Sequence, residues 1–306
     1  MKTFHHIVAA VDFTPYCRAA LREAARRALL DGACITAVHV MDELLVSELK
    51  KAMSVDEATV RKEWLVKLRM FVDESDPGGQ MVNTEVRVGH PFLELVQACA
   101  THDADLLVMG AKGSKDEPGR IGTIAAKCVR KAPVDVLIVR KSMHGPFKHI
   151  VACVDFSENS AKAVQFALHV AEQDKAGVDC LHVFQSAVTM ALDYGGFATP
   201  LPPMVTDEEA LKATQVELDS FLEPFTRRAG SGTVKHLIAE SPNIREAILD
   251  HISRSEADLV VLGTRGKSGL RELLIGTTAE KILQHAPCSI LAVKPDDFVT
   301  AGAVSE

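Results

Sequence analysis

A run of glycines and threonines near the carboxyl end of the chain has the residue types and spacing of an anion-binding site. Gly263 and Gly266 follow a short apolar run, and Gly276 and Thr277 come after a further nine residues. Glycine lets a backbone approach a ligand closely. The free N–H groups at a helix start attract an anion, and the hydroxyls of Thr277 and Thr278 can add donors. The spacing therefore predicts a phosphate site formed by a strand, a loop and a helix start.

The pattern Gly-x2-Gly-x9-Gly-Thr resembles the ATP-binding motif of the universal stress protein family. The resemblance implies ATP as ligand, with Mg²⁺ held through phosphates and water. It also implies that Asp155 meets the adenine or ribose, Val183 lines the base and Arg265 lies over the phosphates. Gly276 is expected to leave room for the phosphates or to have a conformation that only glycine tolerates. The alternatives are glycines that merely turn the loop, and Asp155 as cap of a helix from Ser157 onward.

Other chemistries find less support in the residues. Gly266-Lys267-Ser268 ends like a P-loop, but Val261 stands where that motif needs its first glycine. His39 and His182 lie in strand patterns, where core or near-core roles are expected, and zinc spacings are lacking. No nucleophile–base pair stands out, so we assign no catalytic residue and no metal ligand. The sequence favours nucleotide binding over catalysis. The alternatives are a slow ATPase or phosphotransferase, and an adaptor that binds a metabolite or lipid.

Composition restricts the class of protein. The chain has 306 residues, 47% of them hydrophobic and 25% charged, which predicts two globular domains of ordinary composition. A net charge of −7 argues against nucleic acid as partner, and no apolar run is long enough to span a bilayer. The seven cysteines include no CxxC pair, which predicts reduced thiols in the cytoplasm. Cys153, Cys180 and Cys288 lie in apolar strand patterns and are expected in the core.

The chain is a duplication of one unit. The segments Phe4–Phe13 and Phe147–Phe156 are identical at eight of ten positions, and later segments match in the same order. This length of repeat predicts two domains, residues 1–143 and 144–306, with a boundary near Gly145 and Pro146. Strands that alternate with helices predict a parallel sheet covered on both faces, a Rossmann-like α/β fold. The family resemblance implies five strands per domain in the order 3-2-1-4-5, and pairing of the two domains through their fifth strands as a pseudo-dimer. A homodimer is also possible on this basis.

The elements that must position these residues can be predicted from apolar patterns and helix caps. The predicted strands are 7–11, 35–40, 82–88, 106–109 and 136–139 in the first repeat, and 150–154, 178–184, 234–239, 258–262 and 289–293 in the second. The predicted helices of the first repeat are 14–30 with Thr14 as its cap, 42–76, 91–101 and 123–130. A segment of about 20 residues, 186–206, is predicted to be a lid or partner-binding loop rather than a disordered one.

The first repeat carries a variant of the same motif. The matching residues are Asp12, Val40, Gly110, Gly113, Gly122 and Thr123, but only eight residues separate Gly113 from Gly122. The intervening loop contains Asp116, Glu117 and Pro118. Carboxylates repel a polyphosphate, and proline removes a donor. We therefore expect the first site to be weakened or empty, and one nucleotide to bind per chain.

Overall fold

The computed structural model describes residues 3–53, 56–75, 78–113, 121–140, 145–185, 207–227, 233–266 and 275–298. Close contacts divide the chain into two units. The N-terminal unit comprises residues 2–145 and 289–306, and the C-terminal unit comprises residues 146–288. The first division falls between Gly145 and Pro146, and the last segment, from Ser289 onward, is grouped with the first repeat. The domain bounds 1–143 and 144–306 stay a prediction.

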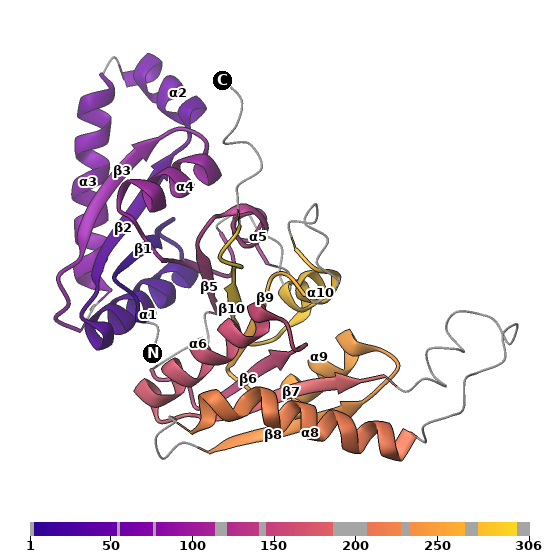
Figure 1. Cartoon of the computed structure of the whole chain (residues 1–306). Coiled ribbons are helices and arrows are strands. Elements are labelled where there is room, and N and C mark those ends of the chain that lie inside the picture. Colours follow the sequence, from indigo (N-terminus) through magenta and orange to yellow (C-terminus); the bar gives the residue numbers. More distant parts are fainter. Residues whose placement is uncertain are drawn as a thin grey trace, which may run out of the picture. The chain divides into compact units, whose positions relative to one another are not determined.

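The N-terminal unit alternates strands with helices (Figure 1). Its elements are β1 (His6–Ala10), α1 (Pro15–Asp31), β2 (Cys34–Met41), α2 (Glu43–Met53), α3 (Glu57–Glu74), β3 (Asn83–Val88), α4 (Pro91–Thr101), β4 (Leu106–Gly110), α5 (Thr123–Lys131), β5 (Asp135–Val139) and β10 (Ser289–Val293). The strands stand in the order β3-β2-β1-β4-β5-β10. All neighbours from β3 to β5 are parallel, and β10 runs antiparallel to β5. The predicted order 3-2-1-4-5 is thus confirmed for the first repeat.

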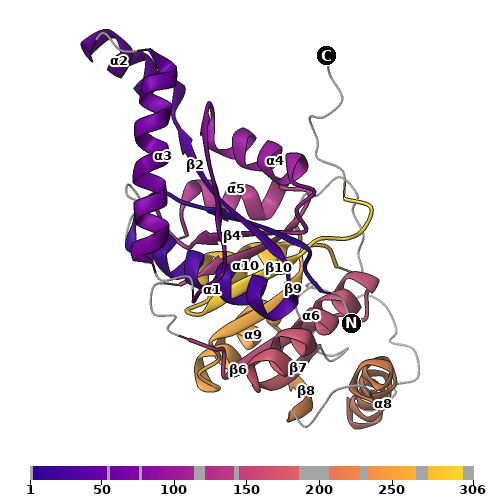
Figure 2. The ribbon, with the colours of Figure 1, turned by 90° about the vertical axis from the view of Figure 1, so that its left-hand side faces the viewer.

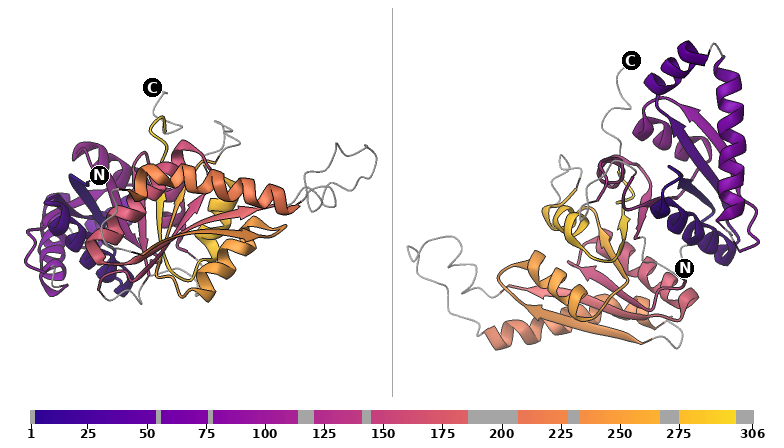
Figure 3. Two further views of the ribbon diagram at one scale, coloured as in Figure 1. Left: turned by 60° about the horizontal axis from the view of Figure 1, so that its bottom comes forward. Right: turned by 180° about the vertical axis from the view of Figure 1, so that it is seen from behind.

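The C-terminal unit repeats this arrangement (Figure 3). Its elements are β6 (His149–Val154), α6 (Glu158–Asp174), β7 (Gly177–Phe184), α8 (Asp207–Thr226), β8 (Val234–Glu240), α9 (Ile244–Arg254), β9 (Leu259–Gly263) and α10 (Thr277–His285). The strands stand in the parallel order β9-β6-β7-β8, which matches the first four strands of the predicted order. Helix α6 packs against β6, β9 and α8, while α9 packs against β7 and α10.

Local signals in the sequence set the helix bounds. Thr14 caps α1 by accepting a hydrogen bond from the backbone N–H of Cys17, as predicted, and Gly32 ends that helix in the left-handed region. The predicted helix over 42–76 is instead two helices, α2 and α3. The side chain of Asp56 accepts from the backbone N–H of Thr59 and so begins a new helix. Helix α3 then lies along β3, on the other side of the strands from α4 and α5 (Figure 2).

The central strands are buried on both faces, as helices on both sides of a parallel sheet require. Leu106, Leu107 and Val108 of β4 have no exposed surface, nor do Val260 and Val261 of the matching strand β9. Apart from differences of a residue or two at their ends, the ten strands lie where the sequence predicts. No helix among the described residues is both long and apolar enough to cross a membrane. The predicted loop 186–206 and the acidic segment 116–118 fall outside the described residues.

Candidate functional site

A cavity of about 300 Å³ opens in the C-terminal unit where β6, β7 and β9 end. All eight residues predicted to bind the nucleotide line it: Asp155, Val183, Gly263, Arg265, Gly266, Gly276, Thr277 and Thr278. Strands β6 and β9 are hydrogen-bonded neighbours, which is the condition for Asp155 and Gly263 to face one crevice. The volume lies at the lower end of the range for small-molecule sites. Residues 267–274, which continue the glycine loop, are outside the described part.

Asp155 organises the turn between β6 and α6. Its Oδ1 accepts hydrogen bonds from the backbone N–H, at 3.1 Å, and from the hydroxyl of Ser157. Ser157 in turn caps α6 by accepting from the backbone N–H of Ser160. The alternative that Asp155 is itself the helix cap is therefore wrong. Phe156 between them has φ of 61°, a conformation that non-glycine residues adopt only when their surroundings impose it.

Gly263 is required by helix packing. A Cβ at this position would lie 2.7 Å from Nδ2 of Asn159, in the first turn of α6. The matching residue of the first repeat, Gly110, is confined by backbone instead of a side chain, because the backbone carbonyl carbon of Tyr16 would lie 2.8 Å from a Cβ. The first glycine of the motif thus lets a helix approach the end of a strand in both repeats. From the sequence, this glycine is expected to let the backbone approach the ligand. At Gly263 the missing side chain instead makes room for α6.

Gly266 brings the loop against Asp155. A Cβ at Gly266 would lie 2.7 Å from Oδ2 of Asp155, so only glycine allows this approach without displacing the carboxylate. Asp155 therefore touches both parts of the predicted site, the turn after β6 and the glycine loop after β9. The second glycine of the motif fixes the shape of the cavity at this point.

Gly276 caps helix α10 with an ordinary backbone conformation. Its φ of −67° and ψ of 151° are accessible to any residue, and a Cβ would lie 3.7 Å from the carbonyl oxygen of Thr264, an ordinary contact. The expectation of a conformation unique to glycine is wrong. Its N–H donates to the Thr264 carbonyl at 2.8 Å, and no side chain caps the helix. The start of α10, with Thr277 and Thr278, therefore lies at the cavity without a side-chain cap and carries partial positive charge.

Apolar side chains form the remaining wall. Val154, Leu181, Val183 and Leu262 come from the strands, Ile244 and Ile248 from α9, and Ile282 from α10. The sequence reasoning missed the two isoleucines of α9, although apolar residues four apart on an amphipathic helix are the signal of a face turned toward the sheet. Cys153, expected in the core, lines the cavity instead. Burial raises the pKa of its thiol to about 12, so it stays protonated.

The first repeat keeps the same backbone framework. Asp12 accepts from the backbone N–H of Thr14 at 3.1 Å, as Asp155 does from Ser157, and Phe13 has φ of 63°. Gly122 caps α5 with φ of −65° and donates to the Ala111 carbonyl at 2.8 Å. Val40 lies in β2, Gly110 ends β4, Gly113 follows it, and Thr123 begins α5.

The chemistry of the first repeat differs at the helix start. Ile124 occupies the position of Thr278, counted from the capping glycines, so the second hydroxyl is lost. The three residues predicted to weaken the loop lie in 114–120, which the structure does not describe. A weakened first site therefore remains a prediction, now supported by the change from threonine to isoleucine.

A histidine at matching positions of the two repeats lies within hydrogen-bond distance of the backbone at the end of the neighbouring strand. Nδ1 of His39 lies 2.8 Å from the carbonyl oxygen of Val11, and Nδ1 of His182 lies at the same distance from that of Val154. Both rings are half-buried, which confirms the near-core position predicted for them. In the first repeat, Trp64 stacks on His39 with ring centroids 4.9 Å apart. Burial lowers the pKa of His39, so the neutral imidazole is favoured.

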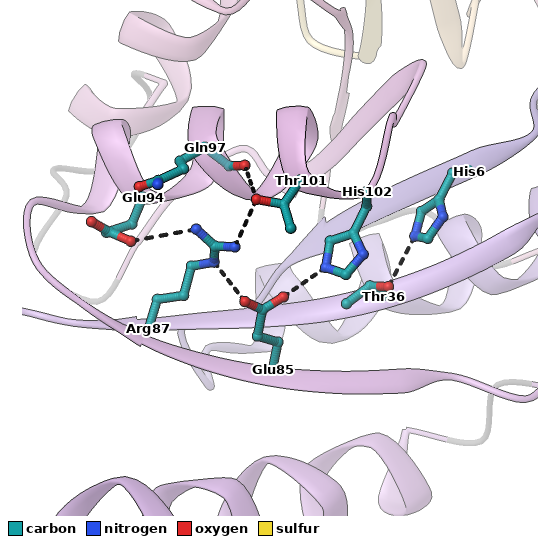
Figure 4. A network of polar contacts seen from close by, with 8 residues as sticks. All are labelled: His6, Thr36, Glu85, Arg87, Glu94, Gln97, Thr101 and His102. Carbon is teal, nitrogen blue, oxygen red and sulfur yellow. Dashed lines mark hydrogen bonds and ion pairs between the residues drawn. The ribbon is translucent and has the colours of Figure 1, made fainter. Parts of the chain in front are cut away.

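Polar networks between the sheet and its helices differ between the repeats. In the N-terminal unit, Arg87 of β3 bonds Glu85 at 2.7 Å and lies 3.6 Å from Glu94 of α4 (Figure 4). His102 bonds the other oxygen of Glu85 at 2.7 Å. The hydrogen bonds from His102 and Arg87 lower the pKa of Glu85 against the opposing effect of burial. The network thus connects α4 to the sheet through charged groups.

In the C-terminal unit a buried carboxylate of β7 connects the sheet to a helix, at the position that Thr36 of β2 occupies in the first repeat. Oδ2 of Asp179, in β7, lies 3.0 Å from Nε2 of His149 and 2.9 Å from Nε2 of His251, which belongs to α9. The carboxylate is 5% exposed and the two imidazoles are 27% and 23% exposed. Asp179 therefore connects α9, the helix that carries Ile244 and Ile248, to the sheet.

Parallel strands, glycine loops and a helix start around one cavity define a Rossmann-like α/β domain with a ligand site at the strand ends. The model of the universal stress protein family matches residues 3–140 and again 146–294. The chain therefore belongs to the universal stress protein family, and it carries the family's domain twice.

Relatives of both lengths are similar to this chain. Universal stress protein Rv2623 of Mycobacterium tuberculosis is 24% identical over 303 residues, which cover 94% of this chain and 96% of the relative. Universal stress protein YxiE of Bacillus subtilis is 28% identical over 148 residues, 48% of this chain and 99% of the relative. The crystal structure of a universal stress protein of Pseudomonas aeruginosa covers 96% of this chain and 94% of its own, with a TM-score of 0.64 and 18% identity. This last likeness supports the two-domain fold.

Proposed function

We propose that the C-terminal unit binds an adenine nucleotide, ATP in the first place, and that the protein acts in stress response as a nucleotide-dependent regulator. The observation that carries this proposal is the convergence of all eight predicted residues on one cavity, with the start of α10 among them. The residues come from the turn after β6, from β7, from β9 and the loop that follows it, and from the start of α10.

The residues present fit the two ends of a nucleotide. The apolar wall of Val183, Leu181 and Ile248 suits a planar base, and Asp155 offers a carboxylate to ribose or base donors. The start of α10, the hydroxyls of Thr277 and Thr278, and the Arg265 side chain suit phosphates. Mg²⁺ would be held mainly by the phosphates and water, since such ions seldom need a full set of protein ligands.

Two other functions differ in what they require. A slow ATPase or phosphotransferase needs a general base beside the phosphates, and the sequence shows no nucleophile–base pair. Of the residues that line the cavity, Asp155 accepts from Ser157, and Nδ1 of His182 lies 2.8 Å from the carbonyl oxygen of Val154. A non-nucleotide adaptor would use the apolar wall for a metabolite or lipid and leave the start of α10 unused. The convergence of phosphate-type donors with the apolar wall favours the nucleotide. We further propose a cytoplasmic location, with which seven free cysteines are consistent.

The test is native mass spectrometry of the purified chain, followed by calorimetry with ATP. We expect a co-purified mass of an adenine nucleotide and a stoichiometry of one ATP per chain. Two equivalent sites would contradict the prediction for the first repeat. A co-purified lipid with no ATP binding would contradict the nucleotide proposal itself. Phosphate release above background would favour the enzyme if it disappears in a variant that no longer binds ATP.

A further inference from the structure

Asn159 is a buried polar residue that lies beneath the glycine loop rather than in the cavity. It belongs to the first turn of α6 and is 7% exposed. Its Nδ2 donates a hydrogen bond to the backbone carbonyl oxygen of Arg265 at 3.2 Å. Arg265 and Gly266 line the cavity, whereas Asn159 does not belong to the lining. The contact therefore acts on the loop from the side of the helix.

This hydrogen bond fixes the orientation of one peptide group. In a trans peptide the carbonyl and the following N–H point in opposite directions. The structure has no cis peptide bond among the described residues, so the carbonyl of Arg265 points to Asn159 and the N–H of Gly266 points away from it. A peptide next to glycine meets little steric resistance to turning over. Without Asn159, the carbonyl oxygen could face the cavity and repel an anion there.

The sequence makes room for this contact at one further position. A Cβ on Gly263 would lie 2.7 Å from Nδ2 and 3.0 Å from Cγ of Asn159. The glycine at the end of β9 is thus what allows the amide to pass beneath the loop. In the first repeat the matching residue is Tyr16, counted from the capping residues Ser157 and Thr14. Tyrosine has no amide to offer the loop, so the two repeats differ at this point.

We infer that Asn159 is a positioning residue for phosphate binding, which holds the Arg265–Gly266 peptide with its N–H toward the phosphates of the ligand. The inference rests on the proposed nucleotide function and deepens it. It assigns to α6 a part in phosphate recognition that the glycine motif alone does not contain. Asn159 contributes nothing to the base or the ribose, which the apolar wall and Asp155 receive.

The test compares ATP with adenosine on the full chain. Asn159→Ala removes the donor at a helical position where alanine is well tolerated. Because one hydrogen bond is lost, we expect the affinity for ATP to fall about threefold to tenfold and that for adenosine to stay within error. Asn159→Leu also removes the amide donor and fills more of the space of the asparagine side chain, so it replaces the alanine variant if that variant does not fold. Tyr16→Ala, at the matching position of the first repeat, is the control and should leave both affinities unchanged.

The outcomes separate the inference from the function on which it rests. A loss for ATP alone supports the positioning role. An unchanged ATP affinity in Asn159→Ala, or an equal loss for ATP and adenosine, overturns it while leaving nucleotide binding in place. A wild-type chain that binds neither ligand overturns the proposed function, and the inference with it.

Discussion

Asp135 accepts a hydrogen bond from the backbone N–H of Lys294 at 2.7 Å, across 159 residues of sequence. A similar hydrogen bond lies at the other end of the pair formed by β5 and β10, where the backbone N–H of Arg140 donates to the hydroxyl of Ser289 at 3.2 Å. Both contacts terminate the antiparallel pairing of β5 with β10. The Lys294 side chain is itself buried, with its ammonium against the backbone carbonyl oxygen of Val129.

Stability should depend on pH through Lys294. Burial lowers the pKa of this lysine to about 7, against the opposing effect of Asp135. Above that pH the unfolded chain binds more protons than the folded one, so stability rises with pH, at most by about 1.4 kcal/mol per pH unit. We expect the wild type to gain stability relative to Lys294→Met between pH 7 and 8.5, because the titration of the thiols is shared by both proteins and cancels in the comparison. Urea denaturation at the two pH values measures it. An equal slope in both proteins would contradict the assignment.

Gly276→Asp should abolish ATP binding without unfolding the chain. The backbone at Gly276 tolerates a side chain, with a Cβ 3.7 Å from the nearest atom, so the loss must come from the ligand. A carboxylate at a phosphate site costs several kcal/mol, which is more than about a hundredfold in affinity. Calorimetry and thermal melts of Gly276→Asp and of its matched control Gly122→Asp give the answer. The control should bind ATP almost as the wild type does. Normal binding by Gly276→Asp would refute the phosphate assignment.

Asp155→Ala should weaken ATP more than Asp12→Ala does. Both carboxylates hold the same turn, through Ser157 and Thr14, so the structural loss is shared by the two variants. The difference between them contains the contact of Asp155 with the ligand and its effect on the shape of the cavity beside Gly266. One hydrogen bond with a charged partner is worth roughly 1.5–3 kcal/mol, or about tenfold and more in affinity. Titration of both variants with ATP tests this, and equal losses would show that the two repeats are used alike.

Asp179→Ala should destabilise the C-terminal unit by about 3 kcal/mol, because two imidazoles lose a buried charged acceptor. Thr36, at the matching place in β2, shares a single hydrogen bond with His6 at 2.9 Å. Thr36→Ala is therefore the control, with an expected loss of about 1 kcal/mol. Chemical denaturation of both variants compares the two losses. Losses of the same size would mean that the buried carboxylate contributes no more than a neutral hydroxyl.

The sequence predicts most of the framework because strand, helix and cap signals are local. Thr14 caps its helix by contacting a residue three positions away, and periodic apolar runs mark the strands. What it could not predict depends on contacts distant in sequence. The demand for glycine at Gly263 comes from Asn159, more than a hundred residues earlier. Ile244 and Ile248 join the site only because α9 folds back over β7.

The same limit applies to the last strand. Nothing in the apolar pattern of residues 289–293 indicates that this strand pairs with β5. Whether two equivalent strands pair in antiparallel fashion depends on which sheet edges come together. The local apolar periodicity of a strand does not determine this. The prediction of fifth-strand pairing came from the family resemblance. Strands β5 and β10 are antiparallel neighbours, and the pseudo-dimer of the two domains stays a prediction.

The pairing of β10 with β5 also determines when the sheet of the N-terminal unit can be completed during synthesis. The edge of β5 cannot be covered until Ser289–Val293 has been made, about 150 residues after β5 itself. At usual rates of translation this is a delay of roughly 10 to 30 s. An uncovered strand edge invites pairing with other chains. A chain that ends after the first repeat should therefore associate with itself through the edge of β5. In the full chain, β10 covers that edge.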